Sequence, residues 1–428
     1  MQTIRSNSLA VYTFSNFFFQ GSRFIAQLFL AKILGPAAFG IWITLQVVLN
    51  YALSAHLGVL DASNRSIPIH IGAGNTTAAC TDARFSMGSA LSLSSVAAAG
   101  VLAVACIGFP DPRLTAAYVM IAAIIILQQL YQQYHFTLAA FQSFRVISYG
   151  QILLGACQIV FLPLFAWKLD LIGLIAGYLI SFTCALGAVI YLTDLRFSPA
   201  FNWAATIRMI RKGAPIMLSS LMFNLMSTID RLFIVRYYGA ESLGHYSLSI
   251  IVSGALMILP MSVIQVFYPR MCQVFGESKN FKTTFLPALQ SIRLLLVCMP
   301  LLIMGCALFM PPLVRLLLVQ YVPGIPAMYI SLAGISSLCF AVALTTYLNT
   351  IGAHYVYLLI QAATIVIGAV LNRISIAFQM HIEGIAVATA CAYLFFLVAM
   401  TGVSLYLRVK GSRSRFIRKG LISPPDCL

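Results

Sequence analysis

The sequence predicts an all-α polytopic membrane protein with about twelve transmembrane helices in two parallel six-helix lobes. Three observations support this fold class. The chain is 61% hydrophobic and only 8% charged, with a mean hydropathy of +0.94, whereas soluble proteins carry about 25% charged residues. Apolar runs long enough to cross a bilayer recur along the chain. The two halves also share a repeat, described next. Together these features exclude a protein with one large soluble core.

The internal repeat has a period of 204 residues, since segment 32–42 (KILGPAAFGIW) matches segment 236–246 (RYYGAESLGHY). A basic residue, two glycines and an aromatic residue recur at identical spacing. Polar residues upstream recur at steps of 4, 3 and 4, which predicts that each set lies on one helix face: Asn16, Gln20, Arg23 and Gln27, then Ser220, Asn224, Ser227 and Arg231. A repeat determines the architecture. The expected parts are lobes at 1–205 and 206–410 and a basic tail at 411–428.

The expected spans follow from the apolar runs. They are 9–31, 39–60, 84–108, 114–138, 148–167, 171–193, 213–237, 244–268, 287–310, 325–349, 357–377 and 383–407. Each half has an even number of spans, so both copies of the repeat enter the membrane from the same side. The connections are expected to be loops, of which the longest are 61–83 and 194–212.

The distribution of positive charge predicts the orientation. The net charge is +16, and most of the 26 Lys and Arg residues fall in loops on one side of the expected membrane. Cytoplasmic loops collect Lys and Arg, so both termini are expected in the cytoplasm. Because the basic residues are spread between apolar spans, the charge indicates a membrane protein, and no nucleic-acid partner is expected.

Polar side chains inside the expected spans are the candidate site, because such residues are costly in a membrane and are functional by default. We expect them to line a shared water-filled cavity between the halves and to bind substrate: Asn16, Gln20, Arg23, Gln27, Gln46, Asn50, Gln128, Gln132, Asn224, Asp230, Arg231 and Arg293. The charged members are mainly arginines, and arginine binds phosphate through two parallel donors. The cavity therefore suits an anionic ligand. Structural pairing or snorkelling remains an alternative for each arginine, and Asp230 could neutralise an arginine or carry a proton.

No catalytic motif occurs in the chain, which contains no nucleophile elbow, zinc-binding HExxH or Walker loop. The six histidines do not cluster and the cysteines form no CxxC pair. No catalytic residue, metal site or cofactor is expected. Transport would then depend on an ion gradient or on the substrate gradient.

Several stretches resemble the polysaccharide-transporter (Wzx-type flippase) branch of the MOP exporter superfamily. They are LGPAAFGIW at 34–42, DASNRSIPIHIGAGN at 61–75, the segment 213–249, and EGIAVATACAY at 383–393. The resemblance implies a MATE-like bundle that flips an undecaprenyl-pyrophosphate-linked oligosaccharide across the bacterial inner membrane by alternating access through a basic central cavity. The product would serve O-antigen, capsule or exopolysaccharide assembly. By position, Arg23 matches the cavity arginine of the first helix, and Asp230 and Arg231 match the pair of the seventh.

The same resemblance implies partners: the lipid-linked oligosaccharide, membrane lipids, and, as candidates, glycan polymerase and chain-length proteins. Two other functions remain open. A multidrug or cation antiporter of the same superfamily needs carboxylates in the amino-terminal lobe, and the expected spans there contain none. A membrane glycan polymerase or ligase usually has a long outer loop, whereas the expected outer loops are short. A non-transporting scaffold would need no polar cavity.

Overall fold

The computed structural model describes residues 2–108, 112–193, 198–278 and 280–410. The expected basic tail, 411–428, lies outside the described residues. Within the described ranges the regular secondary structure is helical, and nine of the helices found there are long and apolar enough to cross a membrane. The predicted all-α membrane fold is therefore confirmed.

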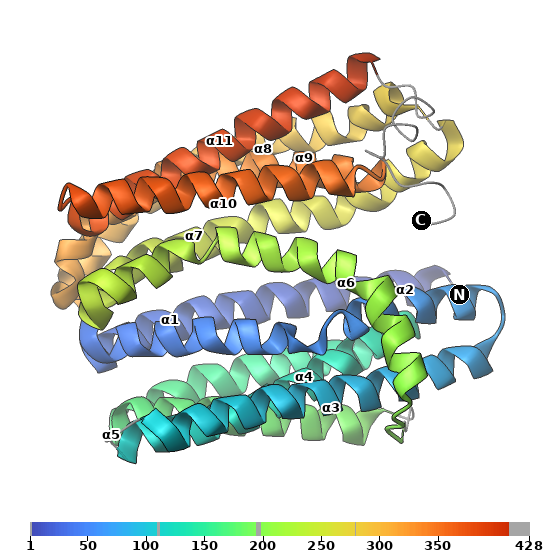
Figure 1. The fold of residues 1–428 in the computed structure, drawn as a ribbon, viewed down its shortest axis with the longest axis horizontal. Coiled ribbons are helices and arrows are strands. Elements are labelled where there is room, and N and C mark those ends of the chain that lie inside the picture. The colour runs from blue at the N-terminus through green and yellow to red at the C-terminus, as the bar shows by residue number, and fades with distance from the viewer. Residues whose placement is uncertain (1, 109–111, 194–197, 279, 411–428) are drawn as a thin grey trace. The chain divides into compact units, whose positions relative to one another are not determined.

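The chain divides into two compact units, 1–221 and 222–428. Unit 1 contains α1 (Gln2–Leu53), the 3₁₀ turn η1 (Ser54–His56), α2 (Val59–Gly72), α3 (Thr76–Gly108), α4 (Pro112–Ala140), α5 (Phe144–Leu192) and most of α6 (Trp203–Met226). Unit 2 contains the end of α6, then α7 (Ile229–Ser278), α8 (Phe281–Leu317), η2 (Val319–Gly324), α9 (Ile325–Thr350), α10 (His354–Ala377) and α11 (His381–Lys410) (Figure 1).

Three helices are too long to be single spans. A straight helix of the 52 residues of α1 would measure about 78 Å, more than twice the hydrocarbon core of a bilayer. The backbone leaves helical geometry at Gly35 in α1, at Leu169 and Asp170 in α5, and at Gly239 in α7. Figure 1 shows α1 turning back on itself. The kinks in α1 and α5 each separate two expected spans, and no loop intervenes.

The sequence repeat extends to the backbone at two of these kinks. Gly35 has φ 71° and ψ 173°, and Gly239, which is 204 residues further on, has φ 83° and ψ 177°. This conformation is open essentially only to glycine. The glycine of each copy is therefore required by the reversal that follows the first helix of the repeat.

Each unit has its own packing of helices, with α5 against two others in unit 1 and α9 at the centre of unit 2. In unit 1, α5 packs against α1 and α4, and α3 packs against α4. An apolar cluster fills the space between α3, α4 and α5, and consists of Met87, Tyr134, Leu138, Ile147, Leu186 and Val189. In unit 2, α9 contacts α7, α8, α10 and α11. The hydroxyl of Tyr347 on α9 donates to the carbonyl of Phe281 at 3.2 Å, which ties α9 to the start of α8.

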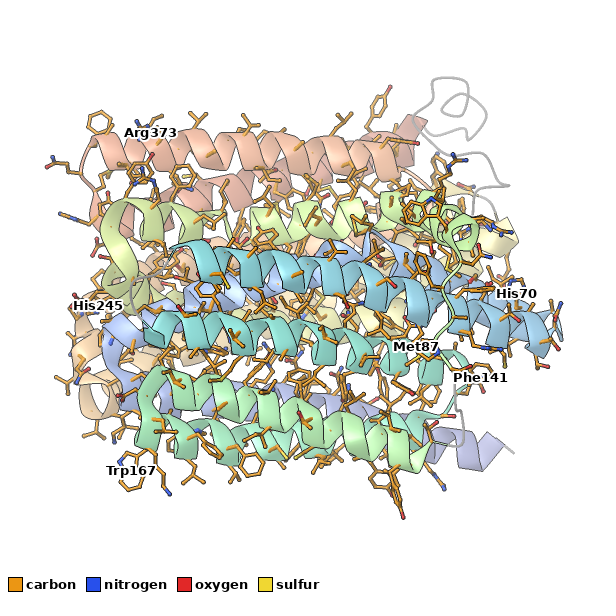
Figure 2. The ribbon with its side chains drawn as sticks, turned by 60° about the horizontal axis from the view of Figure 1, so that its bottom comes forward. His70, Met87, Phe141, Trp167, His245 and Arg373 are labelled. Atoms are coloured by element: carbon orange, nitrogen blue, oxygen red, sulfur yellow. The ribbon has the colours of Figure 1, made fainter. Side chains whose placement is uncertain are left out.

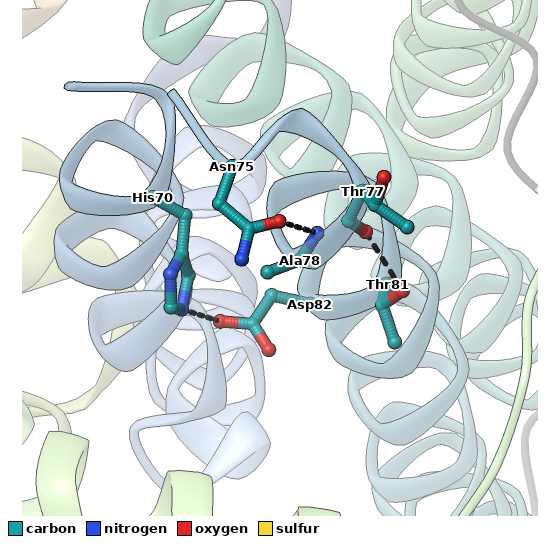
Figure 3. A network of polar contacts seen from close by, with 6 residues as sticks. All are labelled: His70, Asn75, Thr77, Ala78, Thr81 and Asp82. Carbon is teal, nitrogen blue, oxygen red and sulfur yellow. Dashed lines mark hydrogen bonds and ion pairs between the residues drawn. The ribbon is translucent and has the colours of Figure 1, made fainter. Parts of the chain in front are cut away.

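The expected loop at 61–83 is wrong, because α2 and the start of α3 occupy it. The ring Nε2 of His70 on α2 lies 3.3 Å from Oδ2 of Asp82 on α3, and Oδ1 of Asn75 accepts from the backbone N–H of Ala78 at 3.0 Å (Figure 3). Asn75 thus caps α3. Likewise α6 covers 203–212 of the second expected loop. Both segments are polar enough to be missed when only long apolar runs are sought.

The expected seventh span, 213–237, is not one helix. Helix α6 ends at Met226 and α7 begins at Ile229. The hydroxyls of Ser227 and Thr228 both donate to the carbonyl of Asn224, at 3.0 and 2.7 Å. Side-chain bonds of this kind compete with helical backbone bonds. The break falls between Asn224 and Arg231, and the single polar face of this span stays a prediction.

Candidate functional site

A small polar pocket lies inside unit 2, where the first turn of α7 meets α9 and α11. Its volume is about 40 Å³, which is room for one or two water molecules. Seven of its lining residues carry hydroxyls or phenols and two carry charges. The lining comprises Ser227, Asp230, Arg231, Tyr246, Ser249, Ile250, Ser253, Ser331, Gly334, Thr389, Ala390 and Tyr393.

Local sequence explains why the pocket forms here. The Ser227–Thr228 break places Asp230 in the first turn of α7, where the positive end of the helix dipole favours a carboxylate. Gly334 on α9 permits a close approach of α11, since a Cβ there would lie 2.8 Å from both Cα and Cβ of Ala390. Small residues allow helix backbones to approach in this way in membrane proteins.

The Asp230 carboxylate is the central acceptor of the pocket and is only 6% exposed. The hydroxyl of Tyr246 donates to Oδ2 at 2.8 Å, and the backbone N–H of Arg231 donates to Oδ1 at 2.8 Å. A buried carboxylate is costly unless it is hydrogen-bonded or paired. These two donors offset part of that cost and hold the carboxylate in one orientation.

Unsatisfied donors face the same space. Nε of Arg231, Oγ of Ser249 and Oγ1 of Thr389 are buried and have no hydrogen-bond partner among the described residues. Most buried polar groups in folded proteins are bonded. A carboxylate acceptor beside three unmet polar groups is therefore suited to a small polar guest such as water or a hydroxyl. Within the ranges that the structure describes, no group of three His, Cys, Asp or Glu side chains is placed to hold a metal ion.

The other predicted arginines lie elsewhere in their units. Arg23 on α1 is exposed, with its guanidinium carbon 5.7 Å from the ring centroid of Phe19, within range of a cation–π contact. Arg293 on α8 is exposed and does not line the unit 2 pocket. The half-buried residues of the predicted set are Asn16, Gln20, Gln27, Gln46, Gln128, Gln132 and Asn224, and Asn50 is exposed. Whether these side chains share a cavity remains a prediction.

A second polar cluster lies inside unit 1, and its members are not among the candidate site residues given above. Oγ of Ser15 on α1 donates to Oε1 of Gln151 on α5 at 2.8 Å, and Nε2 of Gln151 lies 3.4 Å from Nε2 of His135 on α4. On α4, Nε2 of Gln133 donates to Oγ of Ser86 on α3 at 2.7 Å. Gln151 is an amide within an apolar run, so the signal that identified the other candidates could have found it.

Comparison with solved structures places the fold among membrane transporters. The chain is similar to a MATE family multidrug resistance transporter of the MOP superfamily in its inward-facing conformation, with a TM-score of 0.73 and 16% identity over 92% of this chain and 96% of that one. A MATE structure in complex with MaL6 gives 0.69 and 15%, over 97% of each chain. At these identities the likeness shows the fold alone.

A further structural relative is described by its binding pocket. It is a MOP superfamily transporter from Pyrococcus furiosus for which a reverse polarity of the binding pocket suggests a different function, and it matches with a TM-score of 0.65 and 14% identity over 94% of this chain and 93% of that one. The chain thus shares the polytopic helical fold of these structures.

The family is shown by sequence. A family model described as polysaccharide biosynthesis protein matches residues 29–322. The chain belongs to this family, which confirms the predicted resemblance to the polysaccharide-transporter branch. No curated protein matches the chain.

Proposed function

We propose that this protein flips an undecaprenyl-pyrophosphate-linked oligosaccharide across the bacterial inner membrane, for O-antigen, capsule or exopolysaccharide assembly. The observation that carries the proposal is membership of the polysaccharide biosynthesis family across residues 29–322 in a chain with a MOP transporter fold. The resemblance of the sequence to the polysaccharide-transporter branch implies a lipid-linked glycan as the cargo. Alternating access would expose the cargo site to each side in turn.

The sign of the charge supports an anionic cargo. The chain carries a net charge of +16, and Arg23 is exposed on α1 within the expected span 9–31. An arginine at membrane depth needs an anionic or aqueous partner, and a pyrophosphate offers the oxygen pair that a guanidinium binds. The Pyrococcus furiosus relative, whose description ties pocket polarity to function, supports assigning the cargo by the sign of the site. We assign Arg23 to the pyrophosphate.

We assign the unit 2 pocket to hydrogen bonds with water or with a hydroxyl group during transport. Asp230 can accept a hydrogen bond, while Arg231, Ser249 and Thr389 can donate one. Its volume of about 40 Å³ is too small for a sugar ring and fits a hydroxyl group or one or two water molecules. The proposal places both termini in the cytoplasm. It also retains glycan polymerase and chain-length proteins as candidate partners.

A substitution series at Arg23 tests the function. Arg23→Lys keeps the charge and loses the planar fork of donors, whereas Arg23→Ala loses both. Surface glycan export should therefore fall in the order wild type, Lys, Ala at equal membrane abundance. Arg373→Ala is the matched control, because Arg373 is an exposed arginine on α10 that bonds to the Tyr237 hydroxyl at 2.9 Å; it should leave export unchanged. Full export by Arg23→Ala at equal abundance would overturn the phosphate assignment.

A second candidate function is multidrug or cation antiport. It is favoured by the MATE fold and by a buried carboxylate, Asp230, in a polar pocket. Dye efflux from efflux-deficient cells separates the two functions. Efflux that is lost in Asp230→Asn would establish the antiporter. Glycan export without any dye efflux would leave the flippase as the function.

A further inference from the structure

The first half of α6 has two distinct faces. Ala205, Thr206, Met209 and Gly213 are buried, at helical spacing, whereas Ala204, Arg208, Arg211, Lys212 and Pro215 are exposed on another side. Positions spaced by three and four residues share a face of a helix. This part of α6 is therefore amphipathic, with its apolar face inside unit 1 and a basic face outside. We call residues 198–213 the linker segment.

The buried face is fixed firmly to unit 1. Oγ of Ser89 and Oγ1 of Thr206 lie 2.6 Å apart, and the backbone N–H of Ala200 donates to the carbonyl of Arg84 at 3.1 Å. Met209 belongs to an apolar cluster with Val59 and Ala62 of α2. These contacts determine which side of the linker segment faces outward.

Two glycines permit the close approach of the linker segment to unit 1. A side chain at Gly88 would clash with the Ala200 carbonyl, and one at Gly213 would clash with the Gly58 carbonyl. The segment is thus held at both ends, and the basic face cannot rotate inward without breaking these contacts.

The outward side combines positive charge with exposed aromatic rings. Phe201 is 54% exposed and Trp203 is 61% exposed, and their ring centroids lie 6.2 Å apart. Arg208, Arg211 and Lys212 are exposed next to them along the helix. The sequence has no acidic residue between Asp194 and Asp230, so no carboxylate of the segment itself neutralises this charge.

The place of the segment in the chain identifies its surroundings. It follows α5, whose membrane-spanning stretch ends at Leu192, and it precedes the apolar half of α6. Trp is enriched at the level of lipid headgroups, and basic amphipathic helices lie in that plane and attract anionic lipid. We propose that the basic face of the linker segment binds anionic phospholipid headgroups, with Trp203 and Phe201 inserted at the interface and Arg208, Arg211 and Lys212 on the headgroup phosphates.

Tryptophan fluorescence tests this proposal in the full-length protein. The chain has three tryptophans: Trp42 is 1% exposed, and Trp167 and Trp203 are 73% and 61% exposed. Trp167 lies near the kink of α5, and in Figure 2 it is at the opposite end of unit 1 from His70. Trp167→Phe therefore reports on Trp203, and Trp203→Phe reports on Trp167, while buried Trp42 is constant in both variants.

Both variants are placed in phosphatidylcholine vesicles that contain increasing fractions of brominated phosphatidylglycerol or brominated phosphatidylcholine. The brominated phosphatidylglycerol fraction that halves Trp203 emission should be about fivefold lower than the brominated phosphatidylcholine fraction. Trp167 should show no preference. For Trp203, the ratio of the brominated phosphatidylcholine fraction to the brominated phosphatidylglycerol fraction should fall toward one as NaCl rises, because salt screens exposed charges. This salt titration requires no change to the basic residues.

The triple substitution Arg208→Gln, Arg211→Gln and Lys212→Gln, in the Trp167→Phe variant, should abolish the preference, and Arg373→Gln should retain it. Equal quenching of Trp203 by the two lipids would overturn the proposal. The basic face would then bind a different partner, such as an acidic protein segment. A preference that survives both high salt and the triple substitution would also overturn it.

Discussion

The hydroxyl of Tyr246 donates a 2.8 Å hydrogen bond to the Asp230 carboxylate, and both residues are buried in unit 2. The two lie 16 positions apart in the chain, on either side of the Gly239 kink, so the turn at that glycine brings them together. The pocket of unit 2 therefore depends on a backbone feature as much as on its polar side chains.

Removing this hydroxyl should destabilise unit 2. Tyr246→Phe leaves a buried carboxylate oxygen without its donor, and we expect a loss of about 1–3 kcal/mol in the free energy of unfolding. Thermal unfolding of the purified protein in detergent measures the loss. The control is Tyr191→Phe on α5, where the side chain is 89% exposed and the change should be close to zero. Equal melting temperatures for the two variants would contradict the importance of the bond.

Glycine substitutions in α7 separate backbone strain from packing. A Cβ at Gly239 or at Gly254 would meet no atom within 4 Å, but Gly239 has φ +83°. Gly239→Ala should therefore cost about 1–3 kcal/mol through strain alone, whereas Gly254→Ala should stabilise its helical position by up to about 1 kcal/mol. Opposite shifts in the melting temperature are expected. A neutral Gly239→Ala would show that the reversal does not require the left-handed conformation.

Protonation of Asp61 should make stability depend on pH. Burial raises the pKa of this carboxyl on α2 to about 6, above its ordinary value near 4 in the unfolded chain. The folded state then binds the extra proton between these values, so stability falls as the pH rises from about 4 to about 6 and is constant above. Asp61→Asn should remove this fall. Its melting temperature, followed from pH 4 to pH 7, should exceed that of the wild type by a margin that grows with pH; a constant margin would contradict the assignment.

The docking of the linker segment can be tested by proteolysis. Gly88→Ala places a methyl group against the Ala200 carbonyl, so the segment must shift, whereas Gly100→Ala on the same helix meets no atom within 4 Å. Limited trypsin digestion should cut after Arg208, Arg211 or Lys212 several-fold faster in Gly88→Ala than in the wild type. Gly100→Ala should behave as the wild type. Identical cleavage in all three proteins would show that the close approach at Gly88 is not needed for docking.

The sequence predicted the features that depend on local composition. Apolar runs located the membrane-spanning helices, and the repeat around Gly35 and Gly239 gave the position of two chain reversals. The sequence did not predict the helix break at Ser227 and Thr228. Neither residue is a strong helix breaker, and the break depends on the hydrogen bonds from their hydroxyls to the Asn224 carbonyl.

The candidate site was predicted only in part. Asp230 and Arg231 stood out because charge is rare in an apolar run. Their neighbours Ser249 and Thr389 are ordinary small residues that lie far apart in the chain, on α7 and α11. Nothing in one sequence pairs them, because their meeting depends on how α7 packs with α11. The sequence analysis also missed amphipathic α2 and the start of α6 as helices, because their charged residues interrupt the apolar runs.

The matching kinks at Gly35 and Gly239 have a practical consequence for engineering. The two glycines occupy equivalent positions in tandem copies and adopt nearly the same backbone angles. Each copy can therefore serve as the reference for the other. A residue exchanged between the copies, such as Pro36 for Ala240, tests a local requirement with its natural counterpart and needs no alignment of other proteins. An exchange that the protein tolerates shows that both copies make the same demand at that position, and one that it does not tolerate shows that the two copies require different residues there.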